Sequence, residues 1–305
     1  MTIRIEKQGK VWTVIHSRPE AKNAMDPASA QALEAAFLEF DRDAEAAVAV
    51  LWGEGGAFCA GFDLKHAAQG TGIEAQPYPA DTRTPLPRAP MGPTRLVLDK
   101  PVIAAVAGPA VAGGFEIALW CDLRVMEVSA YFGVYCRRWG VPLIDGGTVR
   151  LPRIVGRGRA LDLILTGRKV EAEEALRINL CEHVVPDGQS RQRAEALANE
   201  IARFPQACMR ADRRSVHHQE GLGLREAMRY EWENGVPMVA AEIARFPQGC
   251  MLADRRAVYL QEGLPLRDAM RSEWHNSLPA LKAEGVAGAA RFASGKGRHG
   301  DSDNI

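Results

Sequence analysis

The chain has 305 residues, 47% of them apolar, and its 38 lysines and arginines balance its 38 aspartates and glutamates. This length exceeds that of a usual single domain, and the apolar content suffices for a full hydrophobic core. Because the net charge is zero, no global field attracts nucleic acid or an anionic membrane, so we expect neither as a partner.

Six cysteines are scattered along the chain without the spacing of a zinc site, and we expect neither a metal nor another cofactor. The N-terminal residues do not resemble a signal peptide, so a reduced, cytoplasmic protein is expected. The apolar run over residues 102–121 approaches membrane-spanning length, but it contains a Gly-Pro pair, a Gly-Gly pair and Glu116. These residues favour a buried strand followed by a helix.

Residues 3–7 and 11–15 predict a β-hairpin, because apolar and polar residues partly alternate on both sides of a Gln-Gly-Lys turn. A helix is predicted after Asn23, where Asp26 supplies a cap and Pro27 lies in the first turn. Its apolar stripe comprises Ala32, Leu33, Ala36, Phe37 and Phe40.

Strands and helices continue to alternate through an apolar stretch at 47–52, and this order predicts an α/β fold. Residues 66–93 interrupt the alternation with many Pro, Gly and Thr residues and little periodicity. They predict a long loop, which is a candidate cover for a binding site.

The most informative segment is 100–122, which predicts a buried strand that passes through a glycine turn into a helix with Glu116 in its second turn. The pair Gly113-Gly114 at the helix start exposes backbone N–H groups, and these donors with the helix dipole favour developing negative charge. That is the physics of an oxyanion hole. A second glycine turn, at 57–65, offers another donor, so two distant segments can hold one carbonyl oxygen.

From about residue 191 the sequence predicts helices, and an internal repeat appears. Residues 200–237 and 242–279 align without gaps at an offset of 42, with 27 identities in 38 positions. Each copy predicts a helix end, a break at Phe-Pro and two further helices, the second containing Trp232 or Trp274. Two copies are too few for a solenoid, which indicates a tandem duplication inside an ordinary chain of 305 − 42 = 263 residues. The apolar stripe of the extra copy must be buried against something. The alternatives are packing on its sister copy, on a neighbouring subunit or over the binding pocket.

Short motifs along nearly the whole chain resemble, in their order and spacing, the crotonase or enoyl-CoA hydratase/isomerase superfamily. They are Arg18-Pro-Glu-Ala-Lys-Asn-Ala24, the two glycine turns, Tyr131-Phe-Gly133, Gly146-Gly-Thr-Val-Arg150, Leu165-Thr-Gly167 and Gly288-Ala-Ala-Arg-Phe292. The resemblance implies an α/β fold in which residues 1–195 form a ββα spiral core with an acyl-CoA site. Residues 196–305 would form a helical trimerisation region that carries the tandem-duplicated unit. An acyl-CoA thioester substrate and a homotrimer or dimer of trimers are implied as well, with coenzyme A only as part of the substrate.

By the same resemblance, the backbone N–H groups of Phe62 and Gly113 form the oxyanion hole for the thioester carbonyl. Glu116 corresponds to one of two glutamates with which family hydratases hold and activate water. Its apolar neighbours should raise its pKa towards acid/base use, and the alternative is a structural glutamate stabilised by the helix dipole.

The second glutamate is missing, because the matching position is Cys136, and a thiol is a poor substitute for a carboxylic acid that protonates carbon. Arg137 and Arg138 could depress the pKa of this thiol, and a plain packing cysteine is the alternative.

Asp145 is the best substitute acid or base, because dienoyl-CoA isomerases and aroyl-CoA dehalogenases of the family have an acidic catalytic residue at or next to this position. A cap for the helix that begins at Gly146 is an equal alternative. For binding of the CoA body the resemblance suggests the second glycine turn, with Arg18 as a further cation. The candidates for this role are Lys22, Ala60, Gly61, Asp63, Lys65, Phe292 and Lys296.

The sequence therefore predicts an acyl-CoA enzyme that performs hydration, double-bond isomerisation or a related lyase step. One alternative is an acyl-CoA binding or scaffolding paralogue with little hydratase activity. Another is a CoA-thioester isomerase or hydrolase that uses Asp145, where hydrolysis would pass through a covalent acyl intermediate on Asp145 or Cys136.

Overall fold

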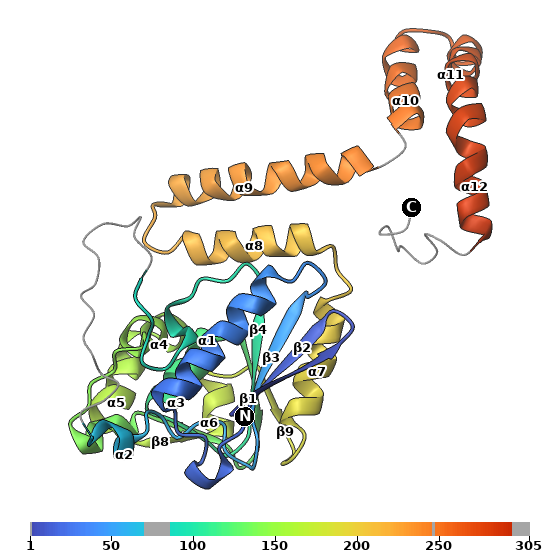
Figure 1. The fold of residues 1–305 in the computed structure, drawn as a ribbon. Helices are drawn as coiled ribbons and strands as arrows, with labels where there is room; N and C mark the ends of the chain where they lie inside the picture. The colour runs from blue at the N-terminus through green and yellow to red at the C-terminus, as the bar shows by residue number, and fades with distance from the viewer. Residues whose placement is uncertain (1, 70–85, 246–247, 295–305) are drawn as a thin grey trace. The chain divides into compact units, whose positions relative to one another are not determined.

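A computed structural model describes residues 2–69, 86–245 and 248–294 of the chain (Figure 1). The chain divides into two compact units, Met1–Gln206 and Ala207–Ile305. The division falls after residue 206 and not after 195, because helix α7 (Ser190–Ile201) packs on the sheet of the first unit. Its contacts come from small apolar side chains, namely Ala194, Ala198 and Ala202.

The first unit is built on a six-stranded sheet in the order β1-β2-β3-β4-β6-β9. Its strands are β1 (Ile3–Gln8), β2 (Val11–His16), β3 (Val48–Gly53), β4 (Val102–Val106), β6 (Leu123–Glu127) and β9 (His183–Val185). Strands β1 and β2 are antiparallel, which confirms the predicted hairpin, and the other neighbours are parallel. The predicted α/β class is confirmed.

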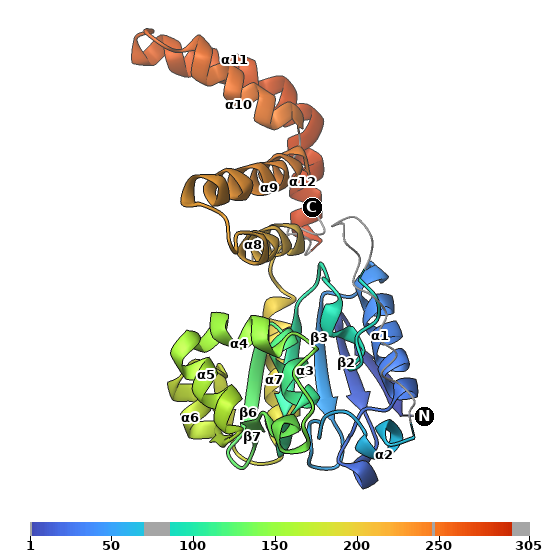
Figure 2. The same ribbon diagram turned by 90° about the vertical axis from the view of Figure 1, so that its left-hand side faces the viewer.

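Helices cover both faces of this sheet, so its central strands β3 and β4 are continuous apolar runs (Figure 2). One face packs against α1 (Pro27–Arg42) and α3 (Gly113–Trp120), and the other packs against α7. Helix α1 begins as predicted, because the Asp26 side chain accepts a hydrogen bond from the Ser29 N–H and Pro27 is the first helical residue. Of its predicted apolar stripe, Leu33, Ala36, Phe37 and Phe40 are buried.

Three short strands form a second sheet and are interspersed along the chain with the last strands of the first sheet. They are β5 (Pro109–Val111), β7 (Tyr131–Gly133) and β8 (Lys169–Glu171). The strand predicted within 100–122 is therefore two strands, which part at Gly108. A side chain there would come within 2.2 Å of the Gly56 carbonyl oxygen, and the backbone φ is +53°. Helix α3 then begins at Gly113, so Glu116 lies in its first turn and not in its second as predicted.

Shorter elements complete this unit. They are η1 (Pro19–Ala21), α2 (Leu64–Ala67), η2 (Pro93–Arg95), η3 (Tyr135–Trp139), α4 (Gly147–Val155), α5 (Arg157–Thr166) and α6 (Ala172–Arg177). Of the loop predicted at 66–93, residues 70–85 lie outside the described residues.

The second unit contains two helical hairpins, α8 (Gln206–His218) with α9 (Leu224–Arg245) and α10 (Gln248–Leu260) with α11 (Leu266–Ala280). A π-helical turn, η4 (Leu281–Gly285), and α12 (Val286–Ala293) follow. The starts of α10 and α11 lie 42 residues after those of α8 and α9, so the two copies of the repeat fold alike. The predicted break at Phe204-Pro205 is present between α7 and α8, and that at 246–247 lies outside the described residues.

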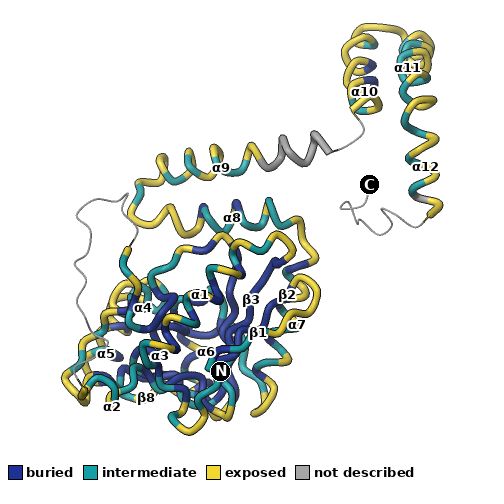
Figure 3. The backbone as a smooth tube through the Cα atoms, in the orientation of Figure 1, coloured by how far each residue is buried: buried dark blue, intermediate teal, exposed yellow. Residues whose placement is uncertain are grey.

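The same interhelical contact occurs in both hairpins. Asn234 donates from Nδ2 to the Ala211 carbonyl, and Asn276, 42 residues later, donates to the Ala253 carbonyl. Both hairpins also leave the same apolar positions exposed. These positions, here called the apolar stripes, are Leu224, Met228 and Trp232 in the first copy and Leu266, Met270 and Trp274 in the second. Exposed stretches of both hairpins are drawn in yellow in Figure 3.

Candidate active site

The two glycine turns predicted to act together are in contact in the first unit. The Val111 N–H donates to the Cys59 carbonyl over 3.0 Å, which aligns the second turn with the strand before α3. At Gly61, whose φ is +94°, a methyl group would lie 2.8 Å from the Ala112 Cβ and 3.3 Å from the Gly113 nitrogen. Only glycine fits there, because a side chain would separate the two turns.

Both turns present an unpartnered backbone donor. Met25 pairs with the residues around Phe62, since its N–H donates to the Gly61 carbonyl and its carbonyl accepts from the Asp63 N–H. In such parallel pairing the N–H of Phe62 itself points away from Met25. Within the described residues, neither this N–H nor that of Gly113 donates a hydrogen bond. Since Gly113 is also the first residue of α3, the pair is suited to bind an anionic oxygen.

The residue before Gly113 holds a backbone conformation that non-glycine residues rarely adopt. Ala112 has φ +52° and ψ −126°, and its N–H donates to the Gly133 carbonyl over 2.8 Å. Such a conformation costs of order 1–3 kcal/mol and persists when surrounding contacts impose it. Here it sets the direction of the Gly113 N–H at the start of α3.

Glu116 is buried, with 3% of its surface exposed, and its carboxylate is held on one side only. Oε1 accepts hydrogen bonds from the Asp145 N–H at 2.9 Å and the Gly147 N–H at 2.8 Å. No described residue donates to Oε2, which leaves that oxygen available to a ligand. Burial, reinforced by the charge of Asp145, raises the pKa of Glu116 to about 7 despite the two N–H donors. A group with this pKa can accept and return a proton near neutral pH.

Asp145 does not cap α4, so that alternative is wrong. Gly146 is the N-cap of α4 without a side-chain bond, and it is Glu116 that accepts from the first N–H of the helix. Oδ1 of Asp145 instead accepts from the Met91 N–H at 3.0 Å and from the Thr94 hydroxyl at 2.6 Å. Burial raises the pKa of Asp145, and these two hydrogen bonds offset part of that rise.

Cys136 lies in η3 as a buried, neutral thiol. Burial raises its pKa, the charge of Glu116 raises it further, and Arg137 offsets only part of this effect. The alternative of a depressed pKa is therefore wrong, and the alternative of a packing cysteine agrees with the burial of this side chain. The neighbouring arginines have other partners, since Arg137 donates to the Ile164 carbonyl and the Arg138 guanidinium stacks on the ring of Tyr135.

The sequence profile described as enoyl-CoA hydratase/isomerase matches residues 6–244. The chain belongs to this family. It is 36% identical over 239 residues to the enoyl-CoA hydratase EchA19 of Mycobacterium tuberculosis, covering 76% of this chain and 86% of the relative. The short-chain-enoyl-CoA hydratase of Clostridium acetobutylicum is 33% identical over 230 residues, with 75% and 86% covered.

A solved enoyl-CoA hydratase structure from Mycobacterium tuberculosis superposes with a TM-score of 0.72 at 32% identity, covering 80% of this chain and 94% of that one. These similarities confirm the predicted family and its mixed α/β fold. The family profile ends at residue 244, so it includes the first copy of the repeat and almost none of the second.

Most of the predicted CoA-binding residues lie in the second glycine turn or contact it. Lys22 and Lys65 are exposed, and the Ala60 N–H donates to the Lys22 carbonyl over 3.0 Å. Asp63 caps α2 and accepts a hydrogen bond from Arg18 at 3.1 Å. The Arg18 guanidinium is therefore ion-paired within the protein and stabilises this turn. Phe292 belongs to α12 of the second unit, and Lys296 lies outside the described residues.

Three residues near the site had no assigned role in the sequence. Arg150 stands in a family motif, and its guanidinium donates to the Asp145 and Thr94 carbonyls at 3.1 and 2.7 Å. Met91 belongs to the predicted loop at 66–93, and Thr94 follows directly after it, so neither residue stands in a pattern that signals a buried contact. No local pattern in the sequence indicates this arrangement.

In the part of the chain that the structure describes, no group of three or more His, Cys, Asp or Glu side chains could hold a metal ion. None of the helices described there is both long and apolar enough to span a membrane.

Proposed function

We propose that this enzyme acts on an enoyl-CoA thioester, whose carbonyl oxygen accepts hydrogen bonds from the N–H groups of Phe62 and Gly113 while Glu116 transfers the proton. One observation carries the proposal. Two unpartnered donors from touching turns lie at the start of the helix whose first turn holds a buried carboxyl group with a pKa of about 7. This combination fits a reaction that places negative charge on a thioester oxygen.

The chemistry explains why both parts are needed. Addition to the β-carbon of an enoyl thioester, or loss of a proton beside the carbonyl, moves an electron pair onto the carbonyl oxygen. Donors aimed at this oxygen stabilise the enolate more than the ground state, and each contributes roughly 3–4 kcal/mol. The anchored Oε1 of Glu116 holds the carboxylate, and the free Oε2 exchanges the proton.

Hydration is the first candidate, supported by the names of the hydratase relatives. Glu116 takes a proton from water as the water oxygen bonds to the β-carbon, and the electron pair of the double bond moves to the thioester oxygen. The enolate then collapses and takes that proton at the α-carbon, which returns Glu116 to the carboxylate. One carboxyl group balances the whole addition, so Cys136 at the second position does not prevent it.

Isomerisation is the second candidate, and the observation that favours it is Cys136 itself. A neutral thiol does not replace a second glutamate in activating water. To move a β,γ double bond into conjugation, Glu116 takes a proton from the α-carbon and returns it to the γ-carbon, and no water enters. A covalent acyl intermediate has less support, because the carboxylate of Asp145 is already engaged by Met91 and Thr94.

For assembly we propose a homotrimer or a dimer of trimers, which the exposed apolar stripes of the helical hairpins support. The chemistry does not depend on this assignment.

The test is incubation of the purified protein with short-chain trans-2-enoyl-CoA and, separately, 3-enoyl-CoA, with products identified by mass. A gain of one water that requires Glu116 supports hydration, and formation of the conjugated isomer without a mass change supports isomerisation. Glu116→Gln is the matched control, because its side-chain oxygen still accepts the two N–H groups. Thioester binding without turnover of either substrate would contradict the proposal and favour a binding paralogue.

A further inference from the structure

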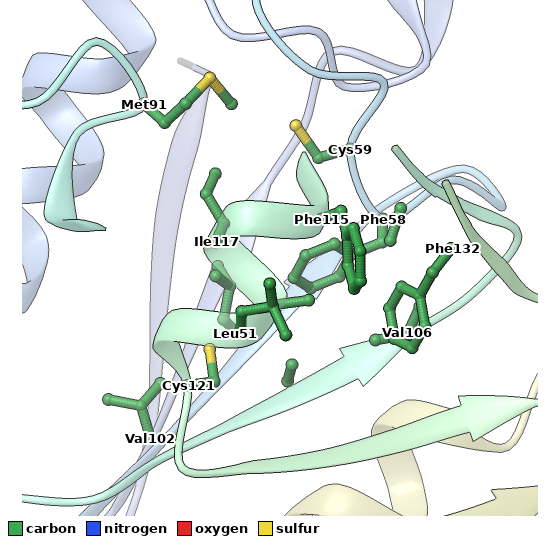
Figure 4. Close-up of a cluster of buried hydrophobic side chains, with 14 of the residues drawn as sticks. Leu51, Phe58, Cys59, Met91, Val102, Val106, Phe115, Ile117, Cys121 and Phe132 are labelled. Carbon is green, nitrogen blue, oxygen red and sulfur yellow. The ribbon is translucent and has the colours of Figure 1, made fainter. Parts of the chain in front are cut away.

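A short segment, residues 89–96, here called the cover segment, lies against the start of α3. Its Ala89, Met91 and Thr94 are buried. The side chain of Met91 is closest to the site, because a methyl group built on Gly113 would lie 2.5 Å from its Sδ and 2.7 Å from its Cγ. Figure 4 shows this thioether beside α3, on the side where Cys59 also lies. Any acyl group whose carbonyl binds at the Gly113 N–H therefore passes close to Met91.

The cover segment is fastened near Met91 through Asp145 and its partner Arg150, and at its far end the Leu96 carbonyl accepts from Trp120 Nε1 over 3.0 Å. Both hydrogen bonds that the Asp145 carboxylate accepts come from this segment, one from the Met91 N–H and one from the Thr94 hydroxyl. Arg150 adds a second connection by donating to the carbonyls of Asp145 and Thr94. At the same time the Asp145 N–H donates to Glu116. Asp145 thus holds the cover segment through its side chain and holds Glu116 through its backbone N–H.

We propose that Asp145 is a positioning residue whose carboxylate seats Met91 against Gly113, and that Met91 thereby limits the width of the acyl chain next to the thioester. This inference rests on the proposed function, since it takes Gly113 as the site of the thioester carbonyl. Met91 suits the role because its thioether fills the gap beside Gly113 and, at 1% exposed, is enclosed by other residues, so it cannot move aside into solvent for a branch near the carbonyl. The substrate class it selects is that of acyl chains unbranched at the α-carbon.

Three substitutions separate positioning from proton transfer at Asp145. Asp145→Asn keeps a side-chain oxygen that accepts from both Met91 and Thr94 but removes the ionisable group. Asp145→Ala removes both hydrogen bonds, and Thr94→Val removes one of them while leaving the carboxylate in place. Met91→Ala removes the wall directly and supplies the reference for a widened pocket.

The first measurement is calorimetric binding of two saturated thioesters, butyryl-CoA and 2-methylbutyryl-CoA, which cannot be hydrated. For Met91→Ala and Asp145→Ala we expect the affinity for the branched thioester to rise about tenfold relative to the straight one, the usual effect of one methylene group in an apolar pocket. Thr94→Val should shift the same ratio less, and Asp145→Asn should leave it unchanged. If Met91→Ala alters the ratio and neither Asp145→Ala nor Thr94→Val does, Asp145 does not position Met91.

The second measurement is turnover of a straight-chain enoyl-CoA by the same variants. Asp145→Asn should lose less than about tenfold in kcat and shift its pH profile to lower pH, because the charge that helps to raise the Glu116 pKa is gone, whereas an acid or base at this position would lose at least 10²-fold. A loss by Asp145→Asn equal to that of Asp145→Ala would overturn the inference. Absence of turnover in the unmodified protein, with the binding ratios as expected, would contradict the proposed function alone.

Discussion

The two compact units of the chain expose and bury their side chains in opposite ways. The first unit buries three carboxyl groups, Glu116, Glu127 and Asp145, and each accepts at least one hydrogen bond within the unit. The second unit leaves Leu, Met and Trp side chains exposed at the same positions of two hairpins. Buried ionisable groups with raised pKa values mark a site of chemistry, and exposed apolar stripes mark a surface for another protein chain. On the proposed function, we therefore expect catalysis in the first unit and association through the second.

The largest effect is expected from Glu116→Gln, which should lower kcat/KM at least 10³-fold, because it removes the group that transfers the proton. The fold should persist, since the glutamine oxygen still accepts from the Asp145 and Gly147 N–H groups. Steady-state kinetics and circular dichroism check the two statements together. Cys136→Ser is the comparison variant, and its activity should stay within a few-fold of the original. A comparable loss in Cys136→Ser would mean that the thiol takes part in the reaction.

The next effect concerns pH, because the raised pKa of Glu116 links its ionisation to stability. Folding raises this pKa from 4.5 to about 7, so the stabilisation is complete below pH 4.5 and is lost as the pH rises through 7. The loss should reach roughly 3 kcal/mol by pH 8. Glu116→Gln lacks this loss, so its urea-unfolding free energy should gain on that of the unmodified protein by this amount between pH 5 and 8. Equal pH dependence of both proteins would show that Glu116 titrates at its ordinary value. Activity should rise over the same pH range, since the ionised form accepts the proton.

Much of the first unit could be predicted from local sequence signals. The hairpin, the cap of α1 and the glycine turn before α3 each depend on residues close together in the chain. The apposition of Gly61 with Gly113 depends on contacts across about 50 residues, and the family resemblance rather than any periodicity indicated it. The split of the predicted strand at Gly108 was missed, because the close approach of Gly56 that requires it leaves no mark in the local pattern.

The site was predicted in its residues but not in its contacts. Glu116 was assigned its environment correctly, because apolar neighbours on both sides imply burial. For Asp145 the sequence offered a cap or a catalytic acid, and its actual partners, Met91 and Thr94, lie more than 50 residues earlier in a stretch without a pattern. For Cys136 the sequence left open a depressed thiol pKa or a plain packing cysteine, and the raised pKa contradicts the first alternative, because arginines adjacent in a sequence need not point at the same side chain.

A smaller effect should distinguish the two hairpins from each other. Asn234 donates to both the Ala211 carbonyl and the Ser215 hydroxyl, whereas Asn276 donates only to the Ala253 carbonyl among the described residues, since alanine stands at 257. At about 1 kcal/mol for each hydrogen bond, Asn234→Ala should destabilise its hairpin by roughly 2 kcal/mol and Asn276→Ala by roughly 1 kcal/mol. Amide hydrogen exchange in α8 and α10 measures the two local opening free energies separately. An equal loss in both would mean that the contact with Ser215 contributes nothing.

The smallest effect on stability is expected where the exposed tryptophans are replaced. Trp232 and Trp274 are 72% and 60% exposed, so alanine at either position should change the unfolding free energy of the dissociated chain by less than about 0.5 kcal/mol. Trp12, which is 1% exposed in the core of the first unit, is the internal control, and its replacement by alanine should cost roughly 3–5 kcal/mol. The exposed pair should act on association instead, so light scattering over a dilution series should show weaker assembly in at least one of the two variants. A stability loss near that of Trp12→Ala, with assembly unchanged, would mean that the apolar stripes are buried within the chain. That result would contradict the proposal that the second unit serves association.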